Sequence, residues 1–106
     1  MVRDQPTRGE IWLVDLGFAQ KTRPVVVLSV AYLDHERAVV TYVARTTSLR
    51  GTRFEIPHEE HSFKAGAFDA QSIGTIPVAK LIKRIGIVQA PLLARLEAAV
   101  RAWLQL

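Results

Sequence analysis

Short runs of apolar residues, bounded by glycine, proline or charged residues, make up most of the chain. Several runs are rich in valine, isoleucine and threonine, and one alternates polar with apolar residues, and both patterns are typical of β-strands. The run after Pro24 is almost continuously apolar, so we expect both faces of that strand to be covered. The expected strands cover residues 11–14, 24–30, 38–44, 52–56, 67–76 and 80–88.

The last part of the chain changes from the strand period to the helix period. Pro91 suits the first turn of a helix, and the large apolar residues after it recur every third or fourth position. The pattern therefore predicts one helix that ends near Leu104. Short strands followed by one terminal helix predict a mainly β fold, a small and strongly bent sheet or barrel with the helix packed across it.

Length and composition limit the function classes. A chain of 106 residues is expected to form a single domain, residues 1–106, with a core of its own. The absence of cysteine excludes disulfides, thiolate metal sites and a cysteine nucleophile. Neither a membrane-spanning stretch nor a signal peptide is indicated, so we expect a cytoplasmic protein without a membrane partner.

The charge balance favours a polyanionic partner. The formal net charge is +4 and the sequence pI is near 10. Arg45, Arg50 and Arg53 lie in a stretch without acidic residues, and a second basic cluster lies at residues 80–84. A solvated surface produces such clusters as well, so charge alone does not identify the function.

Arg23 stands directly before Pro24 at the start of the most apolar strand. The proline favours an extended backbone and the guanidinium stays charged, so we expect a fixed cation at the mouth of this strand. Such a cation can bind a phosphate group, or it can simply pair with a nearby carboxylate such as Asp15. Position alone does not decide between the two.

Four stretches carry a resemblance to a known family. They are the Arg-Gly-Glu-Ile-Trp opening at residues 8–12, the Thr-Arg-Pro-Val-Val of residues 22–26, Thr47 with Ser48, and the Lys-Arg-Ile-Gly of residues 83–86. In these stretches the chain resembles the MazF/PemK (Kid-like) toxins of type II toxin–antitoxin systems. The resemblance covers nearly the whole chain, and its first half is the more specific.

The resemblance implies an SH3-like small barrel of the CcdB/MazF type that pairs as a homodimer. It implies cleavage of single-stranded RNA, with mRNA as the expected target, at short sequences and without a metal ion or other cofactor. The family's reaction uses the ribose 2′-hydroxyl as nucleophile and leaves a 2′,3′-cyclic phosphate and a 5′-hydroxyl. A cognate antitoxin protein would neutralise the toxin.

The family's two catalytic positions map onto Arg23 and Thr47. In-line attack builds negative charge on the phosphate oxygens, which a preorganised guanidinium stabilises. Thr47 would bind the scissile phosphate or orient the 2′-hydroxyl, although a threonine in a turn often bonds its own loop backbone instead. The expected RNA-binding residues are Gln20, Lys21, Ser48, Arg50, Arg53 and Gln71.

Further candidates for RNA contact are Lys64 and three aromatic residues. Phe18, Tyr42 and Phe54 offer rings on which bases can stack. For Tyr42 and Phe54, which lie in or beside expected strands, packing in the core is the alternative.

The chain departs from the family pattern in its fifth expected strand. Many members carry an Asp-Gln pair followed by an arginine there, whereas an ungapped alignment puts Gln71 and Ser72 at the pair and Gly74 at the arginine. Asp69 would replace the aspartate only if the register shifts by two residues. Whether Gln71 or Asp69 takes the family's position stays open.

The three histidines are the side chains that ordinarily titrate near neutral pH. His58 and His61 flank two glutamates after Pro57, in a polar segment expected to be a solvated loop rather than an active site. No helix holds them and no third ligand is placed, so no metal is assigned.

Two other functions compete with the nuclease. One is a CcdB-like toxin that binds and poisons DNA gyrase, and the other is a catalytically weakened RNA-binding module. The presence of both Arg23 and Thr47 favours the nuclease, because a toxin that only binds has no need of that pair.

Overall fold

The computed structural model describes residues 5–17 and 21–106, which form one antiparallel sheet and one C-terminal helix. The sheet has six strands in the order β4-β5-β3-β2-β1-β6. The mainly β architecture with a terminal helix is therefore confirmed. The elements are β1 (Glu10–Gly17), β2 (Lys21–Val27), β3 (Val39–Thr46), β4 (Glu55–His58), β5 (Gly66–Pro77), the short 3-10 helix η2 (Val78–Lys80), β6 (Leu81–Ile87) and α1 (Ala90–Leu104).

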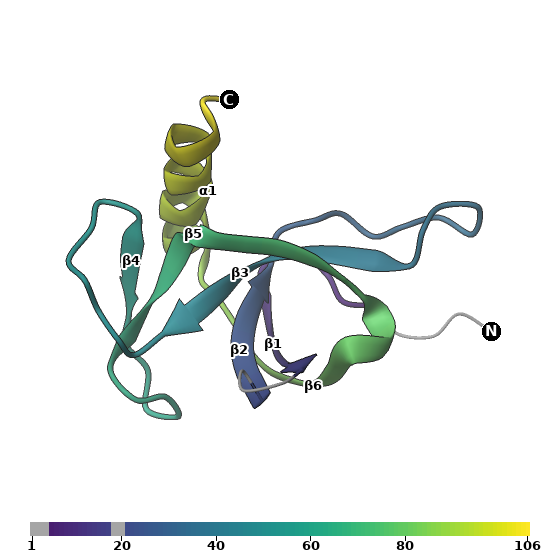
Figure 1. Cartoon of the computed structure of the whole chain (residues 1–106), viewed down its shortest axis with the longest axis horizontal. Coiled ribbons are helices and arrows are strands. Elements are labelled where there is room, and N and C mark those ends of the chain that lie inside the picture. Colours follow the sequence, from purple (N-terminus) through teal and green to yellow (C-terminus); the bar gives the residue numbers. More distant parts are fainter. Residues whose placement is uncertain (1–4, 18–20) are drawn as a thin grey trace.

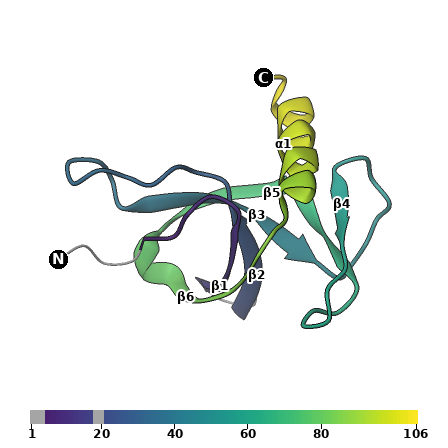
Figure 2. The same cartoon turned by 180° about the vertical axis from the view of Figure 1, so that it is seen from behind.

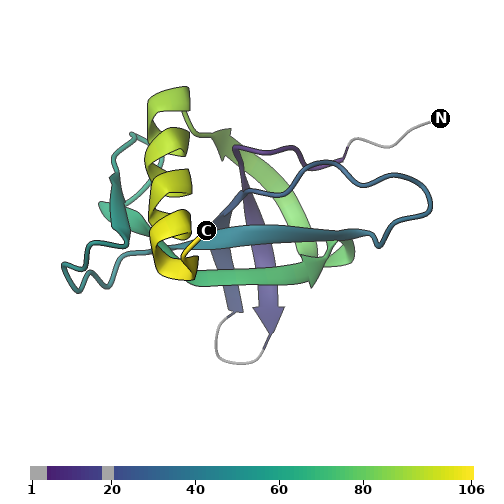
Figure 3. The same cartoon turned by 90° about the horizontal axis from the view of Figure 1, so that it is seen from above.

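The sheet bends strongly, and α1 lies against the part that contains β4 and the start of β5 (Figure 1). Seen from behind, β4 and the connection of residues 28–38 lie at opposite ends of the molecule (Figure 2), and from above α1 crosses the sheet (Figure 3). The described strands thus form an open, barrel-like sheet with β4 and β6 at its edges. No helix in the described part of the chain is long and apolar enough to cross a membrane.

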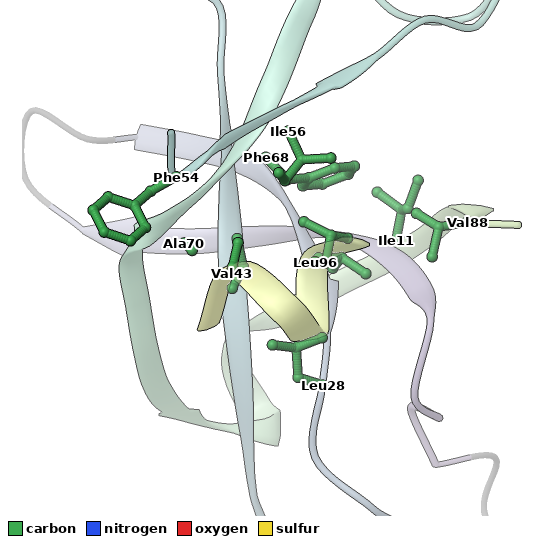
Figure 4. Close-up of a cluster of buried hydrophobic side chains, with 11 residues drawn as sticks. Ile11, Leu28, Val43, Phe54, Ile56, Phe68, Ala70, Val88 and Leu96 are labelled. Carbon is green, nitrogen blue, oxygen red and sulfur yellow. The ribbon is translucent and has the colours of Figure 1, made fainter. Parts of the chain in front are cut away.

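The central strands are buried on both faces. One face carries the main core cluster, with Phe68 of β5 and Leu96 of α1 fully buried near its centre (Figure 4). The opposite face carries a smaller cluster that includes Val25. Val25 and Val26 are both 0% exposed although they point to opposite faces, which confirms the expected cover on both sides of β2.

The predicted end of the second strand is wrong. β2 stops at Val27, and Val30 is 80% exposed. The backbone N–H groups of Leu28 and Ser29 both donate to the carbonyl of Thr41, which ends the regular ladder. Residues 28–38 then project from the sheet as a long connection (Figures 1 and 3). An apolar residue such as Val30 continues a strand only where a neighbouring strand offers backbone hydrogen-bond partners.

The family-like opening at residues 8–12 links four parts of the fold. Arg8 donates to the carbonyl of Leu28 and pairs with Glu97 of α1. Gly9, at φ 93°, donates its N–H to the carbonyl of Val27 and accepts a hydrogen bond from the N–H of Val88. A positive φ favours glycine, which explains the residue at this position.

The side chain of Glu10 is buried and adds further hydrogen bonds to this part of the fold. Its carboxylate is 8% exposed and accepts hydrogen bonds from the Thr7 N–H, the Trp12 indole and Arg84. Burial raises the pKa of Glu10, but these donors outweigh it and hold the pKa below its ordinary 4.5. The stretch that is most specific to the family therefore stabilises the fold.

Candidate active site

Arg23 lies where β2 and β3 stop pairing. The last paired residues are Val25 of β2 and Ala44 of β3. Beyond this pair the Arg23 side chain links the two strands, because its Nη2 donates to the carbonyl of Arg45 at 2.8 Å. No ion pair between Arg23 and Asp15 forms within the described structure, and Asp15 instead accepts a hydrogen bond from the N–H of Gly17. Arg23 is thus a half-buried cation, and among the described residues its side chain has one neutral acceptor.

Arg23 lines two neighbouring cavities, each of about 500 Å³. The first cavity is lined by Arg23, Pro24, Arg45, Thr46, Thr47, Ser48, Ser62, Phe63 and Lys64. The second cavity is lined by Asp15, Leu16, Gly17, Arg23, Tyr42, Ala44, Ser72, Ile73, Ile76, Pro77 and Lys80. A guanidinium between two cavities can contact a group that bridges them.

Thr47 and Ser48 join Arg23 in the first cavity. The hydroxyl of Thr46, not that of Thr47, bonds the turn, since it accepts from the Ser48 N–H at 3.0 Å. The Thr47 side chain is exposed and makes no hydrogen bond to another described residue. Its hydroxyl is therefore available in the cavity.

Arg45 supports the opposite wall of the first cavity. It is buried, so it does not belong to a solvated basic surface. Arg45 is only 5% exposed, and its guanidinium donates to the ring and carbonyl of His58 and to the carbonyl of Lys64. His58 is 3% exposed, so the expectation of a solvated loop is wrong for this residue. His58 is the last residue of β4 and lies beside the rings of Phe63 and Phe68.

Tyr42 forms part of the second cavity and lies over Gly74 of the neighbouring strand. The two residues are paired across β3 and β5, and a Cβ atom at position 74 would lie 2.6 Å from the Tyr42 hydroxyl. No side chain fits there without displacing the tyrosine. The cavity also has a carboxylate, Asp15, and a second cation, Lys80, neither of which was among the predicted site residues.

The other predicted RNA-binding residues lie outside both cavities, as far as they are described. Arg50 uses its backbone N–H to bond Glu55, and the guanidinium of Arg53 stacks on the ring of Phe54 at 4.6 Å. Gln71 is exposed on β5. Their RNA contacts stay predictions. Gln20 and Phe18 lie outside the described residues, and Lys21 begins β2 but its side chain is not described.

A bulge in β5 explains why alignment left the acidic position open. Val43 pairs with Ile73, but the next residue, Ala44, pairs with Asp69. The carboxylate of Asp69 accepts hydrogen bonds from the Gln71 N–H at 3.0 Å and the Ser72 hydroxyl at 3.5 Å, which shape the bulge. Neither Asp69 nor Gln71 is among the residues that line the two cavities beside Arg23.

The described residues contain no group of three or more His, Cys, Asp or Glu side chains able to hold a metal ion. The charges that line the two cavities are mainly positive, from Arg23, Lys64 and Lys80, with Asp15 as the acidic member. Such a surface binds anions, and its polar groups suit a phosphate flanked by larger groups.

Residues 7–104 match the family of PemK-like, MazF-like toxins of type II toxin–antitoxin systems. The chain belongs to this family. Among solved structures, the Mycobacterium tuberculosis toxin MazF-mt6 is similar at 26% identity and a TM-score of 0.79, covering 92% of this chain and 97% of that one.

Two further structures support the family fold at lower identity. MazF from Deinococcus radiodurans matches at 19% identity and a TM-score of 0.83, covering 98% of this chain and 100% of that one. A mycobacterial endoribonuclease solved with its cognate antitoxin matches at 24% identity and a TM-score of 0.81, covering 95% and 96%. The predicted resemblance to the MazF/PemK family is confirmed.

Proposed function

We propose that this protein is a sequence-specific endoribonuclease toxin that cleaves single-stranded RNA, with mRNA as its target, in the cytoplasm and without a metal ion or other cofactor. The observation that carries the proposal is the placement of Arg23, a guanidinium fixed to the Arg45 carbonyl and facing two cavities, with the available hydroxyl of Thr47 in one of them. Similarity to structures described as endoribonucleases supports it.

In the proposed reaction the ribose 2′-oxygen attacks the adjacent phosphorus as the 2′-hydroxyl loses its proton. The bond from phosphorus to the 5′-oxygen breaks, and that oxygen takes up a proton, which leaves a 2′,3′-cyclic phosphate and a 5′-hydroxyl. Arg23 stabilises the negative charge that builds on the non-bridging oxygens. Thr47 donates a hydrogen bond to the same phosphate or orients the 2′-hydroxyl.

The two cavities suit the nucleotides on either side of the scissile phosphate. In the first cavity Phe63 offers an aromatic surface and Lys64 a cation, with Ser48 as a further hydrogen-bonding group. In the second, Tyr42 offers a ring for stacking beside polar groups that can read a base edge. Different linings on the two sides of Arg23 would give the sequence preference.

The same surface suits a neutralising antitoxin. A segment with acidic or apolar side chains would fill the cationic cavities and exclude RNA, and a solved structural neighbour is a complex with its cognate antitoxin. We also propose a homodimer, because the end of α1 leaves apolar side chains in solvent: Trp103 is 42%, Leu104 46% and Leu106 82% exposed. Sedimentation velocity at micromolar concentration tests the dimer.

The test of the activity is incubation of the purified protein with a long single-stranded RNA in EDTA, followed by mapping of the new ends. We expect discrete cuts with 5′-hydroxyl termini and loss of cutting in Arg23→Ala. Arg95→Ala is the matched control, because Arg95 is exposed on α1 and lies outside both cavities.

Each competing function has its own outcome in this test. RNA that binds but stays intact at high protein excess indicates the weakened RNA-binding module. Intact RNA together with inhibition of DNA supercoiling by gyrase indicates the gyrase-binding toxin. Cutting that requires added metal would contradict the metal-independent mechanism.

A further inference from the structure

Arg45 and His58 form a buried pair beneath the first cavity. Nε of Arg45 donates to Nδ1 of His58 at 2.9 Å, and Nη2 donates to the carbonyls of His58 at 2.8 Å and Lys64 at 2.6 Å. The guanidinium also lies 5.0 Å from the ring centre of Phe63. Burial lowers the pKa of Arg45, while the charge of Glu60 acts in the opposite direction.

The pair joins the two walls of the cavity. On one side the carbonyl of Arg45 holds the catalytic candidate Arg23. On the other side the guanidinium of Arg45 bonds the carbonyl of Lys64 and lies over the ring of Phe63, and these two residues line the opposite wall. The fit is close, because a Cβ at Gly66 would lie 2.5 Å from the Thr46 carbonyl and 2.8 Å from Nη1 of Arg45.

The hydrogen bonds define the protonation state of His58. Because Nδ1 accepts from Arg45, the ring proton is on Nε2, which faces the carboxylate of Glu60 at 3.2 Å. The rings of Phe63 and Phe68 pack against the imidazole, and Glu59 lines a neighbouring cavity together with His58. Protonation at Nδ1 would place two N–H groups against each other, so the bond to Arg45 exists only while His58 is neutral.

We propose that Arg45 is a positioning residue, held by neutral His58, which keeps the wall at residues 62–64 in place for RNA cleavage. The role in cleavage rests on the proposed function. Without an acceptor ring at position 58, Arg45 loses one of its three hydrogen bonds, and the guanidinium that contacts Phe63 and Lys64 is held less firmly. Cleavage then falls although neither residue touches the scissile phosphate.

The test compares the wild type with His58→Leu or His58→Ala, which remove the acceptor, and with His58→Asn, because the Asn oxygen can accept from Arg45. Backbone amide signals of residues 62–65 are recorded by NMR for each variant. Cleavage rates are measured for the same set. His61→Asn is the matched control, since His61 is an exposed histidine of the same segment.

In the variants that lack the acceptor we expect the amide signals of residues 62–65 to shift and the cleavage rate to fall at least about tenfold, since a small displacement of a site wall is costly. Both changes should be much smaller in His58→Asn and absent in His61→Asn. His58→Gln offers the same acceptor on a longer side chain if the Asn variant does not fold.

The two proposals fail in different ways. Unshifted amide signals of residues 62–65 in a folded variant that lacks the acceptor, or an equal loss of cleavage in that variant and in the folded Asn or Gln variant, would overturn the positioning role while leaving the nuclease intact. Amide signals that shift as expected in a protein that cuts no RNA would overturn the nuclease and, with it, any role for Arg45 in cleavage.

Discussion

Two arginines meet at the end of β3, and their surroundings give them opposite roles. Arg23 is half-buried, gives one hydrogen bond to a backbone carbonyl within the described part of the chain and faces two cavities. Arg45 is 5% exposed and directs three hydrogen bonds at its own protein. Guanidinium N–H groups that bond other residues of the protein stabilise the fold, whereas N–H groups that face a cavity can bind a substrate. The hydrogen-bond partners of each arginine therefore indicate its role.

The largest expected effect is on catalysis, from Arg23→Ala. We expect cleavage to fall about a thousandfold, because the charge that faces the developing phosphate charge is removed. The free energy of unfolding should change by less than about 1 kcal/mol, since one hydrogen bond to a carbonyl is lost among the residues that the structure describes. Single-turnover cleavage and urea unfolding measure the two quantities.

Arg45→Met should show the reverse balance. The substitution leaves three acceptors on His58 and Lys64 without their donor, so we expect a loss of about 3 kcal/mol in the free energy of unfolding. Urea unfolding of Arg50→Met, an exposed position, is the control and should differ from wild type by less than about 0.5 kcal/mol. If Arg23→Ala proved the more destabilising of the two arginine variants, the comparison would fail.

Thr46 and Thr47 offer a finer version of the same comparison. Thr47→Val should slow cleavage about tenfold with unchanged stability, because it removes a hydroxyl that no described residue uses. Thr46→Val should instead lower the free energy of unfolding by about 1 kcal/mol, since the Ser48 N–H loses its acceptor. Equal cleavage by wild type and Thr47→Val would remove Thr47 from the mechanism.

The smallest effect is expected far from the site, in Glu10→Gln. Because the folded pKa of Glu10 lies below 4.5, its stabilisation is present above that value and is lost as the pH falls through the folded pKa. At neutral pH the free energy of unfolding of the variant should be about 1 kcal/mol lower than that of the wild type. On acidification the variant should lose less of its stability than the wild type does, and cleavage should not change. Thermal unfolding between about pH 6 and pH 3 measures this. Parallel pH curves for both proteins would contradict it.

Much of the fold could be predicted because strands and helices are marked by local periodicity. The buried run of β2 and the helical spacing after Pro91 produced the correct elements. The end of β2 was predicted wrongly, because Val30 is apolar and continues the apolar run of the sequence. The regular ladder ends earlier, where the N–H groups of Leu28 and Ser29 both donate to the Thr41 carbonyl.

Less of the candidate site could be predicted. Arg23 and Thr47 were named from the sequence and do line one cavity, while their catalytic roles remain predictions. Arg45 looked like its exposed neighbour Arg50, and His58 looked like part of a polar loop. Only contacts between segments distant in sequence make them a buried pair.

The sequence by itself determined most of the strand and helix pattern, because it depends on residue type and spacing, and its motifs carried the family resemblance, which implied that Arg23 and Thr47 act on phosphate. Tertiary structure decided which arginine is buried, which threonine bonds the turn and where Asp69 pairs. Burial, hydrogen-bond partners and bulges arise only when β3, β4 and β5 pack together, and identical side chains then acquire different surroundings.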